Sequence, residues 1–381
     1  MCKFSKLFTS TLLVTIVCAS SSAQENSRII KTEKNHIKID KIVGNLKNPW
    51  GMTMLPNGKI LLTERPGTIK LIDPATGKFQ SVSGTPKVWA NGQGGLLDIA
   101  ADPNFKENNT IYLTFSDKTS FGDAGTALAS AKYQAKPKPH LTNLKTLFSM
   151  ENKTKRGVHF GSRIVFDQND NIFITTGDRG DSIRAQNPFD SAGKVLRIKK
   201  DGSIPTDNPY ADGKKALPEI WSIGHRNPQG ATLDQKTGQL WTLAHGAKGG
   251  DEINTPKAGK NYGWPIISYG THYSGAKIGQ GTSAKGFEQP VYYWNPSIAP
   301  SGLNFYSGDL IPQWKGDLFA GALKDQLLTR LEIKNDKVIH EEQMLKGEFG
   351  RIRDVRSFAD GALWLLTDHD DGALLRISPA E

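Results

Sequence analysis

The sequence contains very little cysteine: two of 381 residues, Cys2 and Cys18, and both lie among the first 23. Once those residues are removed no disulfide can form, so packing or bound metal must stabilise the fold. Long hydrophobic runs are also scarce, and no later segment approaches the length of a membrane-spanning helix. There is no block of lysine and arginine interleaved with aromatics, although the net charge is +10. This scarcity argues against nucleic-acid binding, whereas a small, multiply anionic ligand suits the charge.

The first 23 residues have the pattern of a secretory signal peptide. Lys3 and Lys6 form a positive region, residues 7–19 are apolar but too short to span a bilayer, and small residues end the segment at Ala23. We expect cleavage after Ala23 and a periplasmic or secreted mature chain without an integral membrane segment. Lipidation at Cys18 is the alternative, but the residues before it match the usual small-residue box poorly.

Turn-forming residues, in contrast, are abundant: 39 glycines and 20 prolines are spread along the chain and indicate many short strands. One pattern recurs six times, in which an apolar pair is followed by a turn containing Pro, Asp, Asn or Gly and then by an alternating apolar strand. Each copy predicts a β-hairpin. The copies cover residues 50–63, 96–114, 162–175, 230–242, 302–321 and 354–367.

Six irregularly spaced hairpins predict an all-β fold, a six-bladed β-propeller of four-stranded antiparallel sheets, as one domain over residues 24–381. No convincing amphipathic helix separates the hairpins, which argues against alternating β/α units. We expect a strand at 37–43 to pair into the last blade and close the ring, which would remove exposed sheet edges. A large β-sandwich or two separate β-domains is the alternative.

The candidate site residues lie in glycine-rich segments beside these hairpins. Gln93 belongs to Asn-Gly-Gln-Gly-Gly, whose glycines either make a tight turn or let the side chain approach a ligand closely. His159 precedes the third hairpin and Asp178 follows it, and a hairpin brings its two outer ends together. A carboxylate beside an imidazole fixes its tautomer and raises its basicity, as a general base requires. A lone structural histidine is the alternative.

Two further loops carry clustered polar groups. Gly-His-Arg-Asn-Pro-Gln-Gly places Arg226 and Asn227 in a turn whose glycines and proline suggest a fixed geometry. His-Gly-Ala-Lys-Gly-Gly-Asp-Glu places the adjacent carboxylates of Asp251 and Glu252 on a flexible backbone. Because Ca²⁺ takes carboxylate and backbone carbonyl oxygens, the second loop predicts a calcium site. An ordinary surface loop is the alternative.

Late basic residues complete the set of candidates. Lys324 follows the fifth hairpin, and Arg351 and Arg353 precede or begin the sixth. Arginines at positions i and i+2 of a strand share one face. Such a face suits paired carboxylates on a ligand.

Together these motifs resemble those of the soluble glucose/sorbosone dehydrogenases. The motifs that carry the resemblance are Gly-Gln-Gly-Gly-Leu-Leu, His-Phe-Gly-Ser-Arg, Thr-Gly-Asp, Gly-His-Arg-Asn-Pro-Gln-Gly and Gly-Gly-Asp-Glu-Ile-Asn, followed by Lys324, Arg351 and Arg353. The family consists of six-bladed propellers that use pyrroloquinoline quinone (PQQ) and Ca²⁺. The resemblance extends from about Val43 to Ile377, and the compact length is similar to the aldose sugar dehydrogenase branch.

The resemblance implies a role for each candidate residue. His159 would be the general base that removes the hydroxyl proton at the anomeric carbon of an aldose sugar, and Asp178 would orient it. A hydride would pass to the quinone, and Arg226 would stabilise the negative charge that develops there. An electron acceptor that the sequence does not identify would reoxidise the cofactor. The residues implied to hold PQQ are Gln93, Arg226, Asn227, Lys324, Arg351 and Arg353, and the backbone carbonyls of Gly246 and Ala247 would bind Ca²⁺.

The chain departs from the family pattern in two places. Ala247 stands where the family commonly has proline, which should loosen the turn without removing a backbone ligand. The substrate-facing segment at residues 292–297 keeps its aromatic character, but its alignment is ambiguous by one residue. The sugar is therefore left open.

Two other classes of protein compete with the quinoprotein interpretation. A calcium-dependent propeller lactonase or hydrolase would need a carboxylate-rich channel, whereas the candidates here are mostly Arg, Lys, His and Gln. A non-catalytic binding propeller would not require His159 and Asp178 to be in contact.

Overall fold

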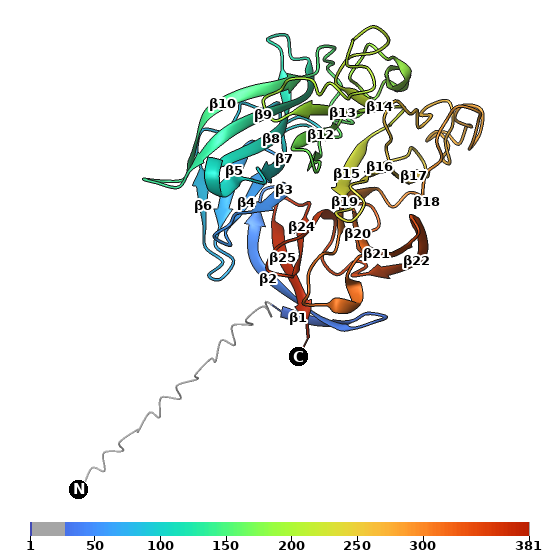
Figure 1. Ribbon diagram of the computed structural model, residues 1–381. Coiled ribbons are helices and arrows are strands. Elements are labelled where there is room, and N and C mark those ends of the chain that lie inside the picture. Colours follow the sequence, from blue (N-terminus) through green and yellow to red (C-terminus); the bar gives the residue numbers. More distant parts are fainter. Residues whose placement is uncertain (2–26, 381) are drawn as a thin grey trace.

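The computed structural model describes Met1 and residues 27–380, so the predicted cleavage site and both cysteines lie outside the described residues. Within residues 27–380 the strands form six antiparallel sheets, five with four strands and one with five, arranged as blades around a common centre (Figure 1). The predicted six-bladed β-propeller is confirmed. None of the helices in this part of the chain is long and apolar enough to cross a membrane.

The blades follow one another along the chain, each beginning with its innermost strand. Blades 1 to 3 consist of β3 (Pro49–Met54), β4 (Ile60–Glu64), β5 (Thr68–Ile72) and β6 (Phe79–Val82); β7 (Leu96–Ala101), β8 (Thr110–Lys118), β9 (Ala124–Gln134) and β10 (His140–Ser149); and β11 (Ile164–Phe166), β12 (Asn171–Thr175), β13 (Lys194–Lys199) and β14 (Ile220–Ile223). Blades 4 to 6 consist of β15 (Pro228–Leu233), β16 (Leu240–Ala244), β17 (Asp251–Asn254) and β18 (Tyr292–Trp294); β19 (Pro300–Phe305), β20 (Leu318–Ala322), β21 (Leu327–Lys334) and β22 (Lys337–Met344); and β23 (Ile352–Ser357), β24 (Leu363–Thr367), β25 (Gly372–Pro379), β2 (His36–Leu46) and β1 (Ser27–Lys31). The short helices are α1 (Phe105–Asn108), η1 (Ser182–Gln186) and η2 (Pro312–Trp314).

Each of the six predicted hairpins forms the two inner strands of a blade. In the first, Met52 pairs with Leu62 and Met54 with Ile60, across the Pro-Asn-Gly turn. The second and fifth have longer connections that hold α1 and η2, which explains why their turns are less regular in the sequence.

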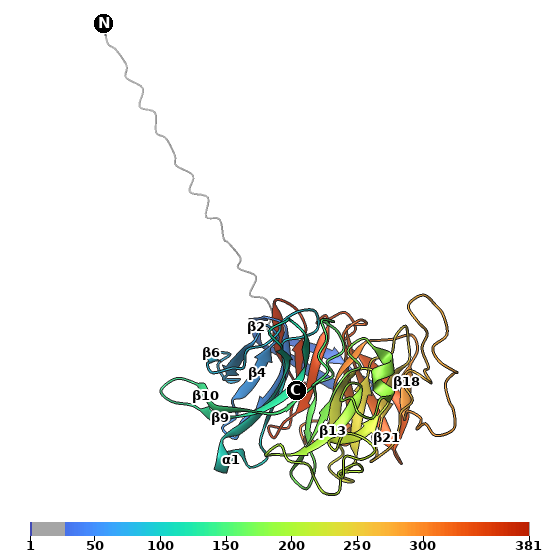
Figure 2. The ribbon, with the colours of Figure 1, turned by 90° about the horizontal axis from the view of Figure 1, so that it is seen from above.

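The N-terminal strand closes the ring as predicted. β2 pairs with β25, with Ile39 opposite Ile377, so the last blade combines both ends of the described chain (Figures 1 and 2). Pairing distant ends of a chain removes two exposed strand edges at once.

The core consists of apolar layers between neighbouring blades. β24 shows why its Leu-Trp-Leu-Leu run is apolar throughout: Leu363 and Leu365 pack in one layer, while Trp364 and Leu366 pack in the next. Successive side chains of a strand point to opposite faces, and here both faces are buried.

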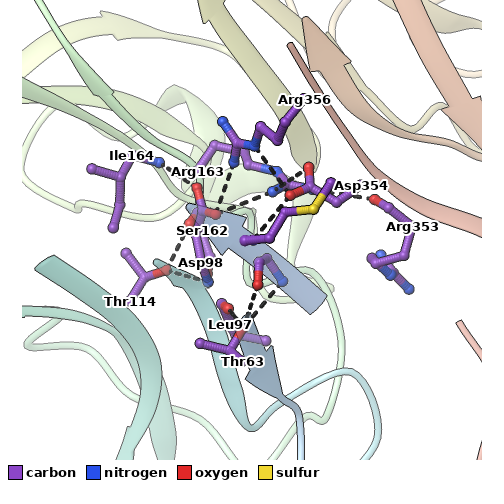
Figure 3. Close-up of polar contacts among 12 residues, drawn as sticks. Thr63, Leu97, Asp98, Thr114, Ser162, Arg163, Ile164, Arg353, Asp354 and Arg356 are labelled. Carbon is purple, nitrogen blue, oxygen red and sulfur yellow. Dashed lines mark hydrogen bonds and ion pairs between the residues drawn. The ribbon is translucent and has the colours of Figure 1, made fainter. Parts of the chain in front are cut away.

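A network of charged residues, which we call the hub, fills the centre of the ring (Figure 3). It consists of Asp98, Arg163, Asp354 and Arg356, contributed by blades 2, 3 and 6. Arg163 Nη1 lies 3.2 Å from Asp98 Oδ1 and 2.9 Å from Asp354 Oδ1. Arg356 contacts the same two carboxylates at 2.9 and 3.1 Å.

The hub also forms hydrogen bonds with the backbone of three blades. The backbone N–H of Met52 donates to Asp354 and that of Ile164 to Asp98, while Arg163 Nε donates to the carbonyl of Gln229. Buried charges are tolerated when they are paired and hydrogen-bonded, and the hub meets both conditions. The hub therefore ties blades 1, 2, 3, 4 and 6 together at the axis.

Candidate active site

The predicted site residues gather at one end of the ring, which we call the mouth. The first and second strands of a blade are antiparallel, so the start of the first strand and the end of the second lie at the same end of the sheet. His159, Arg226 and Arg351 precede innermost strands, and Asp178 and Lys324 follow second strands. Segments far apart in the sequence therefore meet at the mouth.

His159 and Asp178 are in contact, as the hairpin argument predicts. Nδ1 of His159 lies 2.6 Å from Oδ1 of Asp178, and the side chains are 14% and 2% exposed. Burial would raise the pKa of Asp178, but its bond to His159 and nearby positive charge hold that pKa below its usual value. Asp178 is therefore ionised and accepts, so Nδ1 carries the hydrogen and Nε2 is the free, basic nitrogen.

The charge on His159 is set by its surroundings. Burial lowers the pKa of His159, its bond to Asp178 works in the opposite direction, and the positive charges of Arg226 and Arg179 lower the pKa further. The imidazole is therefore neutral at pH 7, the form that can accept a proton.

The backbone of His159 lies in the left-handed region, with φ of 54°. Its N–H donates to Oε1 of Gln93 at 2.8 Å. Gly177 of the Thr-Gly-Asp motif packs against the carbonyl of His159 so closely that a Cβ there would lie 2.2 Å from the oxygen. A non-glycine residue holds this conformation only when its surroundings fix it. Gln93 thus positions His159, and its amide nitrogen has no acceptor among residues 27–380.

Arg226 and Asn227 reach the same place from blade 4. The carbonyl of Arg226 accepts from the N–H of Asp178 at 2.8 Å, and its guanidinium donates to the carbonyl of Gly246. Asn227 Oδ1 accepts from the N–H of Gly161 at 3.0 Å. Its Nδ2 is buried and has no acceptor among residues 27–380. A buried donor without a partner is costly, so Asn227 is suited to donate to a ligand oxygen.

Arg351 and Arg353 are fixed by Asp368, which lies outside the sequence motifs, and Arg353 also by Gln229, a member of the Gly-His-Arg-Asn-Pro-Gln-Gly motif to which the sequence assigned no role. Asp368 Oδ2 accepts from Nη2 of Arg351 at 3.2 Å and of Arg353 at 2.5 Å, and Gln229 Oε1 accepts from Arg353 at 2.7 Å. Although burial works against the charge of Asp368, the two arginines lower its pKa to about 2. A carboxylate that follows a second strand in the sequence, as Asp178 also does, is the signal that could have identified Asp368.

Lys324 lies at the mouth but is more open. Its side chain is 59% exposed, and Nζ donates to the carbonyl of Ser297 at 2.8 Å and lies 3.5 Å from Asp325.

His245 lies beside Arg226 at the mouth. Its side chain is partly exposed, and desolvation of the ring together with the charges of Arg226 and Arg353 lowers the pKa of His245 to about 3. Arg226 Nη1 donates to the carbonyl of His245 at 3.3 Å, and Nε2 of His245 contacts the carbonyl of Pro300.

The loop for which the sequence predicts calcium carries two carboxylates in different surroundings. Asp251 accepts from the backbone N–H groups of Gly246, Ile298 and Ala299 and from the Ser297 hydroxyl, at 2.7–3.1 Å, and so braces the loop. Glu252 accepts only from Asn254, at 3.1 Å, among the described residues. Burial, with the neighbouring Asp251 charge, raises the pKa of Glu252 to about 7.

The described residues contain no group of three or more His, Cys, Asp or Glu side chains placed to hold a metal ion. A site made mainly of backbone carbonyls, as predicted for Gly246 and Ala247, does not require such a group. The metal assignment stays a prediction.

The aromatic segment at 292–297 belongs mostly to blade packing. Tyr292 and Trp294 donate to the Glu341 carboxylate of blade 5 at 2.6 and 2.9 Å. Tyr293 is 45% exposed and stacks on Tyr269, with ring centroids 3.9 Å apart. Of the three aromatics, Tyr293 is the one whose ring is open to a ligand.

Comparison with known proteins identifies the family. The family model for Glucose / Sorbosone dehydrogenase matches residues 46–376. The chain belongs to this family. The sequence is 40% identical to an aldose sugar dehydrogenase of Escherichia coli over 373 residues, covering 97% of this chain and 98% of the relative. Family membership confirms the resemblance found in the motifs and makes the chain a sugar dehydrogenase.

Solved structures agree with the sequence comparison. The apo form of the soluble aldose sugar dehydrogenase from E. coli superposes with a TM-score of 0.87, at 40% identity, covering 90% of this chain and all of that one. The PQQ-bound form of an aldose sugar dehydrogenase from Streptomyces coelicolor superposes with a TM-score of 0.75, at 27% identity, covering 91% of this chain and 100% of that one.

Proposed function

We propose that the protein oxidises aldose sugars at the anomeric carbon to the lactone, with PQQ and Ca²⁺ as cofactors. The observation that carries this proposal is the His159–Asp178 pair, with Nδ1 of the neutral imidazole 2.6 Å from a buried carboxylate. Such a pair presents Nε2 as a general base for the hydroxyl proton of the sugar.

The remaining groups at the mouth fit a multiply anionic cofactor. Arg226, Lys324, Arg351 and Arg353 supply positive charge, Gln93 and Asn227 supply amide donors, and the Asn227 donor is buried without a partner among residues 27–380. A relative of known structure holds PQQ, which carries three carboxylates. When bound, PQQ would supply a quinone as hydride acceptor, and Ca²⁺ would polarise it.

Each residue then has a distinct task. His159 takes the proton and keeps it beside Asp178, whose negative charge stabilises the imidazolium. Arg226 would stabilise negative charge on a hydride acceptor bound next to the base. Arg351 and Arg353, held by Asp368, bind carboxylates. The carbonyls of Gly246 and Ala247, with Asp251 or Glu252, would hold Ca²⁺, and an electron acceptor still to be identified would regenerate the cofactor.

A hydrolytic function fits the mouth less well. Water activation by calcium needs carboxylates free to ligate the metal. Asp178 and Asp368 are each already engaged by protein donors.

The test is reconstitution of the purified protein. Adding PQQ and Ca²⁺ should produce aldose-dependent reduction of an artificial electron acceptor dye. Omission of either cofactor, or Asp178→Asn, should reduce the rate strongly. Absence of sugar-dependent dye reduction over a panel of aldoses, with PQQ shown to be bound, would overturn the proposal.

A further inference from the structure

The indole of Trp264 lies between the two groups that flank the proposed base. Its Nε1 donates to Oδ2 of Asp178 at 2.8 Å. The guanidinium carbon of Arg226 lies 5.3 Å from the centroid of its ring, within the range of a cation–π contact. Trp264 comes from the long connection between β17 and β18, a segment that the sequence motifs did not include.

The backbone of Trp264 is anchored on both sides. Its N–H donates to the carbonyl of Gly224 at 3.0 Å, and its carbonyl accepts from Nε2 of Gln186 at 2.7 Å. Asn261 Oδ1 accepts from the N–H of Gly263 and from the same Gln186 amide. The backbone that carries the indole is therefore held by blades 3 and 4 through contacts that do not involve Asp178.

Trp264 completes the hydrogen bonds of Asp178. Oδ1 accepts from Nδ1 of His159 at 2.6 Å and from the N–H of Gly180 at 2.7 Å. Oδ2 accepts from Trp264 alone, as far as the described residues show. Without this donor, one oxygen of a buried carboxylate would have no partner, and the group could turn away from the imidazole.

We propose that Trp264 is a positioning residue of the dehydrogenase, which fixes the Asp178 carboxylate against His159 and holds Arg226 beside them. The inference rests on the proposed function, because it assigns Trp264 a role through the base. Positioning matters because displacement of a reacting group by about 1 Å can cost about 10²-fold in rate.

The groups that face His159 set the direction of the expected change. They are Asp178, Arg226 and Arg179, with His245 nearby. Loss of the indole N–H would let the Asp178 carboxylate turn away from the imidazole, which weakens the hydrogen bond that raises the pKa of His159. Burial and the positive charges of Arg226 and Arg179 would then meet less opposition, so the pKa of His159 should fall.

The experiment compares Trp264→Phe with a matched control, Trp364→Phe. Trp364 makes the same two kinds of polar contact away from the mouth: Nε1 donates to Asp360 at 3.1 Å, and Arg376 lies 5.9 Å from its ring. Its ring is fully buried, so the thermal stability of both variants is measured as well. In Trp264→Phe the phenyl ring keeps an aromatic face toward Arg226, so the substitution removes only the N–H and some volume.

Two readouts are measured for both variants and for the parent protein. The first is the His159 pKa in the cofactor-free protein, by NMR with ¹⁵N-labelled histidine, with the signal assigned by its loss in His159→Gln. The second is kcat and KM against pH after loading with PQQ and Ca²⁺. We expect Trp264→Phe to lower the His159 pKa and to shift the acid limb of kcat to lower pH with it, and to lower kcat about tenfold with KM little changed.

The outcomes separate this inference from the proposed function. An unchanged His159 pKa and pH profile in Trp264→Phe, with normal oxidation by the parent protein, would overturn the role of Trp264 alone. Equal loss of kcat in both variants, in step with their thermal stability, would also overturn it. No sugar oxidation by the loaded parent protein would overturn the proposed function, and the catalytic role of Trp264 with it.

Discussion

The hub and the mouth each contain a group of arginines, and the positive charges of the two groups are balanced differently. In the hub, Arg163 and Arg356 face Asp98 and Asp354, and each carboxylate contacts both guanidinium groups. At the mouth, Arg351 and Arg353 share the single carboxylate of Asp368. Arg226 has no carboxylate within ion-pair distance in the part of the chain that the structure describes.

The difference indicates what each group is for. Buried charges that neutralise one another need no ligand, so the hub is explained by the fold alone. At the mouth the arginines outnumber the carboxylates, and the buried amide of Asn227 has no acceptor among residues 27–380. A ligand that is anionic and accepts hydrogen bonds explains both features. Arg353 joins the two groups, because its carbonyl accepts from Arg163 while its side chain reaches Asp368. The hub thus supports the mouth.

The largest effect should follow loss of the proposed base. His159→Ala should lower turnover by roughly 10²–10⁴-fold, the usual contribution of a positioned general base. Binding of PQQ should persist, because the cations at the mouth are untouched. Steady-state kinetics and cofactor titration check both expectations. Near-normal turnover, or activity restored by more PQQ, would remove His159 from the role of base.

A substitution in the hub should lower the free energy of unfolding and leave turnover nearly unchanged. Arg163→Leu leaves Asp98 and Asp354 buried with less compensation, and breaking a buried ion pair costs about 3–5 kcal/mol. Urea unfolding measures this loss of free energy. Where the protein still folds, turnover per folded molecule should stay within about threefold of the parent value, well short of the loss expected when a general base is removed. A hub variant of normal stability would contradict the division between the two groups.

Arg351→Ala should leave stability nearly unchanged and weaken cofactor binding. The Arg351 side chain is 38% exposed, so unfolding should change little. Cofactor affinity should fall by about 1.5–3 kcal/mol if one charge-assisted hydrogen bond is lost. Activity should therefore return at high PQQ concentration. Loss of activity at saturating PQQ would mean that Arg351 contributes to the reaction itself.

The sequence was sufficient for the fold because each blade repeats a local signal. A hairpin depends on its own turn and on alternating apolar residues, as at Met52 to Leu62, and neither needs knowledge of distant segments. The closing strand was predictable as well, since a ring without closure leaves two edges. Contact between His159 and Asp178 followed from the same hairpin geometry.

The parts that the sequence did not reveal depend on long-range contacts. Trp264 reaches Asp178 across 86 residues, and Gln229 reaches Arg353 across 124. No spacing rule connects such positions. The residue types of Asp251 and Glu252 suggested one shared role, whereas burial and donors make Asp251 a brace for the loop and leave Glu252 with a single donor among the described residues. Which of them contributes to calcium binding is still a prediction.

The smallest effect, a change of a few degrees in melting temperature, should come from Glu252. Its pKa is raised to about 7 in the folded protein, above the ordinary value of 4.5. The unfolded chain therefore releases this proton more easily, and the metal-free protein should lose stability as pH rises from about 4.5 to 7. Glu252→Gln should remove that loss.

If Glu252 is a calcium ligand, Ca²⁺ should raise the melting temperature of the parent protein more at pH 8 than at pH 5, where the carboxyl is protonated. Calcium should do little for the melting temperature of the variant. Thermal unfolding with calcium or chelator at both pH values measures this. Equal stabilisation of parent and variant at pH 8 would exclude Glu252 as a ligand and leave the metal to the carbonyls of Gly246 and Ala247.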